Sequence, residues 1–277
     1  MMKLGTKIAA VTFVLLAAGP ALAGKGGSAA KIQSAVTSGS VDAIVAEIER
    51  AESLMCERCV GIVTNLLEDD RYAVREAAAW WFAKRPAIKD MLATQFVTEL
   101  ASGDTIAVRN AADFLGRTVT YTSLPALRTA IKRTDVGADA KLAMVRAVKY
   151  MAHQSGNPVL TVAMTDADAT VRAAAVAAWR DIRGQKDATP AVSLLADADA
   201  TVRAEAATVV GGMRAAAGLS ALETLVVSDA DPFVRRNAAW ALGKLGAASS
   251  RTALTTASTD KSGVVRGVAR AALASIK

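Results

Sequence analysis

Asp166-Ala-Asp-Ala-Thr-Val-Arg172 recurs as Asp197-Ala-Asp-Ala-Thr-Val-Arg203 and, with two changes, as Asp229-Ala-Asp-Pro-Phe-Val-Arg235. The basic residue that ends this segment continues in both directions along the chain, at intervals of 31 to 34 residues. A fixed period of this length is typical of stacked repeats, not of one compact domain. Seven repeats are in register, and their basic residues, from which positions within a repeat are counted, are Arg75, Arg109, Lys141, Arg172, Arg203, Arg235 and Arg266.

The residues around each basic position predict a helix with one apolar face. Position −1 is valine or alanine, position +3 is alanine except at Met144, and positions +6 and +7 are mostly apolar. At about 100° per residue these positions share one face. In the third repeat we place Lys141 at the basic position, because the alternative, Arg146, would break the period. Position −4 holds residues that we expect to cap the helix, namely Thr105, Gly137, Asp168, Asp199, Asp231 and Ser262.

Each such helix follows a shorter apolar one, for example residues 123–131, so each repeat is predicted to be a helix pair. A single pair cannot bury its apolar face alone, and neighbouring pairs must therefore stack. We predict an all-α fold, an α-solenoid of about seven helix pairs over residues 56–277. Residues 24–55 are predicted to form a flexible N-terminus followed by capping helices, since Ile32, Ile44 and Ile48 have helical spacing.

The N-terminus is typical of a secretory signal peptide. Lys3 and Lys7 precede an apolar run over residues 8–18, and Ala21-Leu22-Ala23 matches a cleavage site, so residues 1–23 are predicted to be removed. We expect a periplasmic or extracellular protein with no transmembrane segment in the mature chain. Cleavage lowers the formal charge from +7 to +5, because it removes two lysines and no acid. This mild, interspersed charge argues against a nucleic-acid partner.

The recurring pattern, best seen from Asp229 to Gly243, resembles the HEAT repeat of the short, phycobilisome-lyase-like subclass. The resemblance implies that acids and arginines of successive repeats form a polar ladder through the stack, with a structural role. The ladder residues would be Asp69, Asp135, Asp166, Asp197, Asp229 and Asp260 with Arg75, Arg109, Lys141, Arg172, Arg203, Arg235 and Arg266; in the second repeat Gly103 replaces the acid.

HEAT-type deoxyhypusine hydroxylases hold iron through His-Glu pairs, which this chain lacks. The bilin lyases act inside phototrophs, where an exported protein would not meet their substrates. We predict no catalytic residue, cofactor or metal site.

Cys56-Glu-Arg-Cys59 is the only cysteine motif. In an oxidising compartment two thiols on one helical turn can close a small disulfide, which is the structural interpretation. A redox role would need a thiolate stabilised by a helix N-terminus, and a zinc site shared between two chains would need further ligands. The spacing leaves these alternatives open.

In HEAT stacks the second helices line the concave surface, where positions +1, +5 and +8 lie opposite the core face. Trp81 and Phe82 occupy core positions, so Trp80 is predicted to face the groove, unless it packs under the loop around Pro86. The predicted partner-binding residues are Glu76, Trp80, Asn110, Phe114, Arg117, Arg146 and Lys149.

We therefore predict an exported scaffold that binds a protein or peptide. The alternatives are a thiol redox or lyase-type accessory factor that uses Cys56 and Cys59, and a component of a larger assembly. The oligomeric state stays open.

Overall fold

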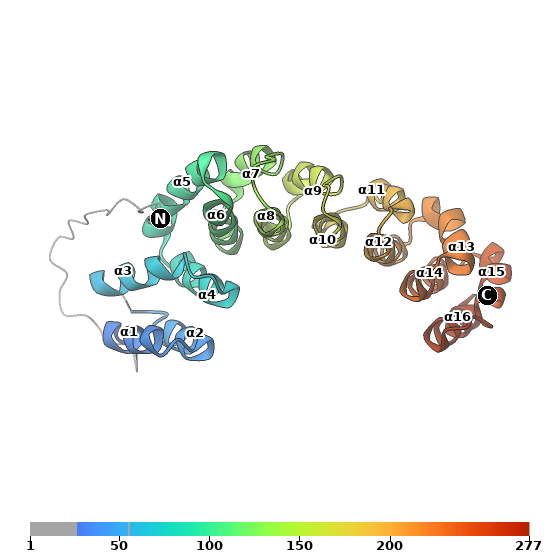
Figure 1. Ribbon diagram of the computed structural model, residues 1–277, viewed down its shortest axis with the longest axis horizontal. Helices are drawn as coiled ribbons and strands as arrows, with labels where there is room; N and C mark the ends of the chain where they lie inside the picture. Colours follow the sequence, from blue (N-terminus) through green and yellow to red (C-terminus); the bar gives the residue numbers. More distant parts are fainter. Residues whose placement is uncertain (1–26, 55, 277) are drawn as a thin grey trace, which may run out of the picture. The chain divides into compact units, whose positions relative to one another are not determined.

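The computed structural model describes residues 27–54 and 56–276, and the predicted signal peptide lies outside these residues. Within the described ranges the chain is all-α, with sixteen α-helices, short 3-10 helices between several of them, and no strand (Figure 1). None of these helices is both long enough and apolar enough to span a lipid bilayer. The chain divides into two compact units, of which the first ends at Asn65 and the second begins at Leu66.

The first unit contains the predicted capping helices. Helices α1 (Ala29–Ser38) and α2 (Val41–Arg50) pack against each other, and α3 (Glu57–Leu66) follows. The side chains of Ser28 and Ser40 accept hydrogen bonds from the first turns of α1 and α2, which satisfies amide groups that have no partner within the helix. The isoleucines that predicted these helices, Ile32, Ile44 and Ile48, are all fully buried.

The second unit is the solenoid. It begins with α4 (Tyr72–Ala83) and continues as six pairs, in which every second helix packs against the second helix of the next pair. The second helices thus form one layer and the first helices the other (Figure 1). The pairs are α5 (Pro86–Ser102) with α6 (Thr105–Arg117), α7 (Leu124–Ala130) with α8 (Ala138–Met151), α9 (Asn157–Ala163) with α10 (Ala169–Trp179), α11 (Thr189–Ser193) with α12 (Ala200–Gly212), α13 (Leu219–Ser228) with α14 (Pro232–Leu245), and α15 (Arg251–Ala257) with α16 (Gly263–Ser275). The predicted α-solenoid is confirmed.

The predicted helix starts are nearly all correct. Asp168, Asp199 and Asp231 cap α10, α12 and α14 by accepting hydrogen bonds from amides of the first turn. The prediction for α6 was wrong by one residue. Thr105 is the first residue of α6, and Asp104 caps it by accepting a hydrogen bond from the Ala107 amide at 2.9 Å. Aspartate is the stronger capping acceptor of the two adjacent residues.

The polar ladder is present from the third repeat onward. Arg172 lies 2.8 Å from Asp197 of the next repeat, and its guanidinium also donates to the Asp166 carbonyl of its own repeat at 2.8 Å. The arrangement recurs for Arg203 with Asp229 and Arg235 with Asp260, both at 2.7 Å. Lys141 pairs with Asp166 at 2.6 Å, which confirms the register chosen for the third repeat. Each ion pair joins neighbouring repeats, as the resemblance implied.

The two links of the ladder that would join the first repeat to the second and the second to the third are absent, and there the prediction was wrong. Asp135 pairs with Arg133, two residues earlier, at 2.6 Å and not with Arg109. Asp69 pairs with Arg71 at 2.7 Å. In both cases an arginine two residues away reaches the carboxylate without crossing to another repeat. Gly103 stands where the second repeat would otherwise have its ladder acid, so Arg75 has no carboxylate to pair with there. Arg75 binds Asp113 instead.

We expect the ladder to make stability depend on acid pH. Hydrogen bonds from Arg172 and Arg235 hold the pKa values of Asp197 and Asp260 below the ordinary 3.8. A lowered folded-state pKa contributes stability above the unfolded value, and this is lost as pH falls through the folded value. Burial raises the pKa values of Glu68 and Glu99 above 4.5, so these groups act in the opposite direction and at higher pH.

The melting temperature should therefore stay level or rise slightly from pH 7 to about 5 and fall below about pH 4. Thermal unfolding monitored by circular dichroism measures this directly. The Asp197→Asn variant should melt lower at neutral pH and lose less on acidification. A melting temperature that stays level down to about pH 2 would contradict a stabilising ladder.

The end of α6 provides a stabilising substitution. Val119 has φ of 52°, in the left-handed region that a β-branched residue rarely adopts. Its amide donates to the Gly116 carbonyl and the Thr120 amide to the Leu115 carbonyl, the paired pattern that usually has glycine at this position. Val119 is exposed and loses little burial when truncated. Val119→Gly should raise the free energy of unfolding by about 1 kcal/mol, measured by urea denaturation; a lower midpoint would contradict the expected relief of strain.

Candidate functional site

The interruption of the ladder coincides with a group of polar and aromatic side chains on three successive second helices. We call it the second-helix cluster. It comprises Tyr72, Arg75 and Glu76 of α4, Asp113 and Arg117 of α6, and Arg146 and Tyr150 of α8. All seven lie in the second unit.

Asp113 is the buried centre of the cluster. It occupies position +4, which is apolar in five of the other six repeats, and the last repeat has the exposed Arg270 there. The five apolar residues are Ala79, Val145, Val176, Ala207 and Ala239. Its side chain is 2% exposed and binds two guanidinium groups, that of Arg75 at 2.7 Å and that of Arg146 at 2.6 Å.

Arg75 is also buried, with its side chain 4% exposed. It completes its hydrogen bonds on the carbonyls of Asp69 and Asp70, at 2.7 and 2.8 Å. A buried ion pair offsets the loss of hydration only when the remaining donors and acceptors are satisfied. The carboxylate and both guanidinium groups are therefore fixed in place.

Two tyrosines and a glutamate form the accessible rim of the cluster. The Tyr72 and Tyr150 hydroxyl oxygens lie 3.2 Å apart, and the Tyr150 hydroxyl donates to the Glu76 carboxylate. Arg117 lies 3.4 Å from Glu76, while the Arg146 guanidinium lies 4.2 Å from the centre of the Tyr72 ring. These contacts join α4 to α8 across α6.

Burial raises the pKa of both tyrosine hydroxyls. The hydrogen bond from Tyr150 to Glu76 adds to this effect for Tyr150, because deprotonation would place two negative charges together. Both hydroxyls therefore remain protonated at physiological pH and act as hydrogen-bond donors.

Helices α6 and α8 approach closely because Gly116 has no side chain. A Cβ atom at Gly116 would lie 2.4 Å from Cα of Ala147 on α8, closer than any real contact of this kind. The bridge from Tyr72 to Tyr150 requires this approach, since α6 separates the two helices that carry them. The contacts of the rim thus depend on the absence of a side chain at Gly116, although Gly116 is not part of the rim.

The structure brings three predicted binding residues together. Glu76, Arg117 and Arg146 belong to the cluster. Lys149 lies on the same helix as Arg146, has a 57% exposed side chain and pairs with Asp181 at 3.2 Å. Trp80 is half-buried, and the Lys84 ammonium lies 5.5 Å from the centre of its ring.

Phe114 and Asn110 are buried and are not exposed on the second-helix layer, so those two predictions were wrong. Phe114 is 1% exposed and its ring packs 4.7 Å from Phe96, while Asn110 is 5% exposed and accepts a hydrogen bond from Arg109. Helix α6 packs against α4, α5 and α8, so its sides are covered as well as its core face. The prediction treated the helix as having a single buried face, and in a stack both flanks are buried too.

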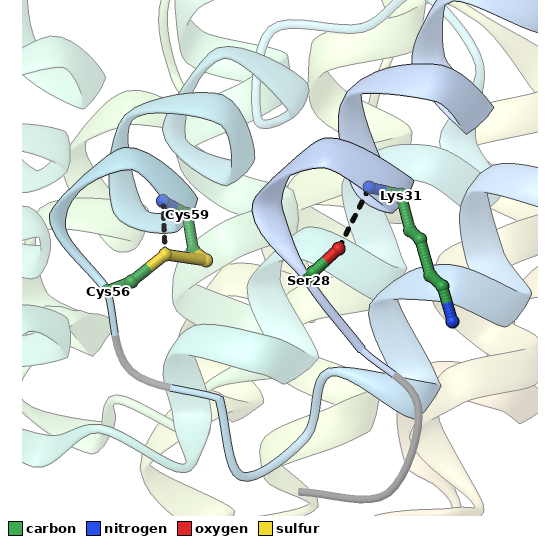
Figure 2. The surroundings of a disulfide bond; sticks show 4 residues. All are labelled: Ser28, Lys31, Cys56 and Cys59. Atoms are coloured by element: carbon green, nitrogen blue, oxygen red, sulfur yellow. Dashed lines mark hydrogen bonds between the residues drawn. A yellow bond between two sulfur atoms is a disulfide. The ribbon is translucent and has the colours of Figure 1, made fainter. Parts of the chain in front are cut away.

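The two cysteines lie in the first unit, at the start of α3 (Figure 2). Their sulfur atoms are joined at 2.10 Å, and the Cys59 amide donates to the Cys56 sulfur at 3.1 Å. Cys59 is fully buried, whereas Cys56 is half-buried. The described part of the chain holds no group of three or more histidine, cysteine, aspartate or glutamate side chains placed to bind a metal ion.

Comparison with known proteins supports the fold. Residues 189–274 match the family model of HEAT repeats. No curated protein matches the chain. The crystal structure of YibA from Escherichia coli is similar with a TM-score of 0.56 at 15% identity, over 88% of this chain and 92% of YibA.

Two further solved structures belong to proteins of known activity or binding. Kap95p, in a complex with RanGDP, is similar with a TM-score of 0.56 at 14% identity, over 89% of this chain and 40% of Kap95p. Human deoxyhypusine hydroxylase has a TM-score of only 0.39 at 19% identity, over 89% of this chain and 97% of the hydroxylase, and carries no argument about activity. At these identities the likeness concerns the fold alone.

Proposed function

We propose that this protein is an exported, non-enzymatic scaffold that binds a protein partner through its concave second-helix layer, at the rim of the second-helix cluster. One observation carries the proposal: Asp113 is the only acid in a column that is apolar in five of the other six repeats, and its buried carboxylate binds two arginines. A charge that recurs in every repeat stabilises the stack, whereas a buried acid that occurs once in its column distinguishes one repeat from the others. Kap95p, whose fold is similar, is an example of a solenoid in a complex with another protein.

The chemistry of the rim suits protein recognition. Tyr150 of the rim is 38% exposed, and the side chains of Arg117 and Arg146, which contact the rim, are 31% and 33% exposed. Tyrosine and arginine are enriched among residues that dominate binding energy at protein interfaces. Contacts within the cluster already restrict these side chains, so less conformational entropy is lost when a partner binds.

The test is affinity capture of the mature protein from the envelope of its own cells, followed by mass spectrometry. The double variant Tyr150→Ala, Arg117→Ala should lose a partner that the wild type retains. Trp240→Ala is the matched control, because Trp240 occupies the second-helix layer three repeats away from Tyr150 and its ring lies 5.5 Å from the Lys244 ammonium. Retention of every wild-type partner by the double variant would refute the proposed surface.

The alternative role for Cys56 and Cys59 has one observation in its favour. The Cys59 amide hydrogen bond to the Cys56 sulfur would stabilise a Cys56 thiolate if the disulfide were reduced. We nevertheless expect a structural disulfide, because Cys59 is fully buried. Thiol titration of the purified native protein should find no free thiol, before and after incubation in a glutathione buffer. Rapid, reversible exchange with that buffer would instead favour a redox role.

A further inference from the structure

The first-helix layer carries an open groove between α7 and α9, with a volume of about 1040 Å³. Tyr121, Pro125, Arg128 and Lys132 lie on the α7 side, and His153 and Pro158 on the α9 side. These residues belong to the opposite layer from the second-helix cluster and take no part in it. The remaining lining residues are threonine, serine and leucine, so the lining contains two cations and no acid.

The positive charge of this groove is peculiar to one repeat. Arg128 follows Leu127, and the residues that follow the equivalent positions Leu160, Val192, Leu222 and Leu254 are Thr161, Ser193, Glu223 and Thr255. Arg128 and Lys132 are both exposed, and neither has an ion-pair partner among residues 27–54 and 56–276. A structural role in the stack would not need this pair, because the other first helices pack without it.

The remaining groups in the groove add hydrogen-bond donors and apolar surface. His153 Nδ1 accepts a hydrogen bond from the Ser155 amide at 3.1 Å, so in the neutral ring the proton resides on Nε2, which can donate. The Tyr121 ring packs edge-on against His153, with centroids 5.5 Å apart, and is 44% exposed. The groove thus combines donors and cations with an apolar surface from tyrosine and proline.

We propose that this groove binds an extended, acidic peptide segment. Arg128 lies in the last turn of α7 and Lys132 in the turn that follows this helix, and both line the groove. Alternate side chains of an extended chain project to the same side, so one segment can present several carboxylates to both cations. The rings of Tyr121, Pro125 and Pro158 provide an apolar surface for the aliphatic parts of the peptide's side chains.

Fluorescence anisotropy with a fluorescein-labelled octaglutamate peptide tests this proposal, with labelled octaserine as the uncharged control. The double variant Arg128→Gln, Lys132→Gln should weaken octaglutamate binding about tenfold or more. Lys261→Gln, Arg270→Gln removes the same charge from exposed positions of the last repeat and should change the Kd less than about twofold. Circular dichroism establishes that both variants remain folded.

Three results would overturn the proposal. Octaglutamate binding that is undetectable at millimolar protein would exclude the ligand class. An equal loss in the two double variants would show attraction to the net charge and not to the groove. Binding to phosphatidylglycerol vesicles that Arg128→Gln, Lys132→Gln abolishes, without peptide binding, would assign the groove to an anionic membrane surface instead.

Discussion

Replacing Asp113 by alanine is expected to lower the free energy of unfolding by about 3–5 kcal/mol, although it restores the apolar residue type of its column. The substitution leaves the Arg75 guanidinium without its carboxylate at a site that is 4% exposed, and such a buried, unpaired charge is strongly destabilising. Arg146 loses the same partner but can turn toward water, since its side chain is 33% exposed. Urea denaturation measures the change.

Two variants separate this mechanism from a general loss of packing. Arg146→Ala should cost only about 1 kcal/mol, because it removes the more exposed partner and leaves the Arg75–Asp113 pair intact. Arg75→Met combined with Asp113→Leu should recover much of the stability that Asp113→Ala loses, since two apolar side chains of similar volume replace the buried pair. If Asp113→Ala proves neutral or stabilising, Asp113 does not hold the buried charge in place.

Gly116→Ala is the second substitution for which we expect a large effect, about 1–3 kcal/mol of destabilisation. The new methyl group would meet Cα of Ala147 at 2.4 Å, and backbone cannot move aside as a flexible side chain can. Helix α8 must then shift away from α6, which also separates Tyr150 from Tyr72 and Glu76. Partner binding should therefore fall together with stability.

Gly267→Ala is the matched control for this substitution. Gly267 lies within α16, and a Cβ atom there would have no neighbour within 4 Å. Alanine is the better helix former by about 1 kcal/mol, so this variant should be stabilised. Thermal unfolding of both variants measures the contrast; equal stabilisation at positions 116 and 267 would show that α6 and α8 are not in close contact.

Most of the solenoid could be predicted from the sequence, because its period fixes which residues share a face. The core at position −1, the caps at Asp168, Asp199 and Asp231, and the ladder from Lys141 onward all follow from one register. Each of these features depends on local helix geometry or on a contact that every repeat makes with its neighbour. Such contacts repeat in space wherever they repeat in sequence.

The second-helix cluster was only partly predicted, because it consists of departures from the period. Glu76, Arg117 and Arg146 were identified, while Tyr72, Arg75, Asp113 and Tyr150 were missed. A signal was present in the sequence: Asp113 is the only acid in a mostly apolar column, and Gly103 replaces the acid that Arg75 would otherwise bind. The link between Tyr72 and Tyr150 spans 78 residues and skips a repeat, so no pattern between neighbours could reveal it.

Photo-crosslinking in the protein's own cells tests most directly whether the second-helix cluster is the partner-binding surface. Benzoylphenylalanine would replace Tyr150 in one variant and Ala271, an exposed residue of the last second helix, in the other. The proposed site predicts a discrete adduct with one protein from position 150 and no such adduct from position 271. The same adduct from both positions, or an adduct from position 271 alone, would contradict it.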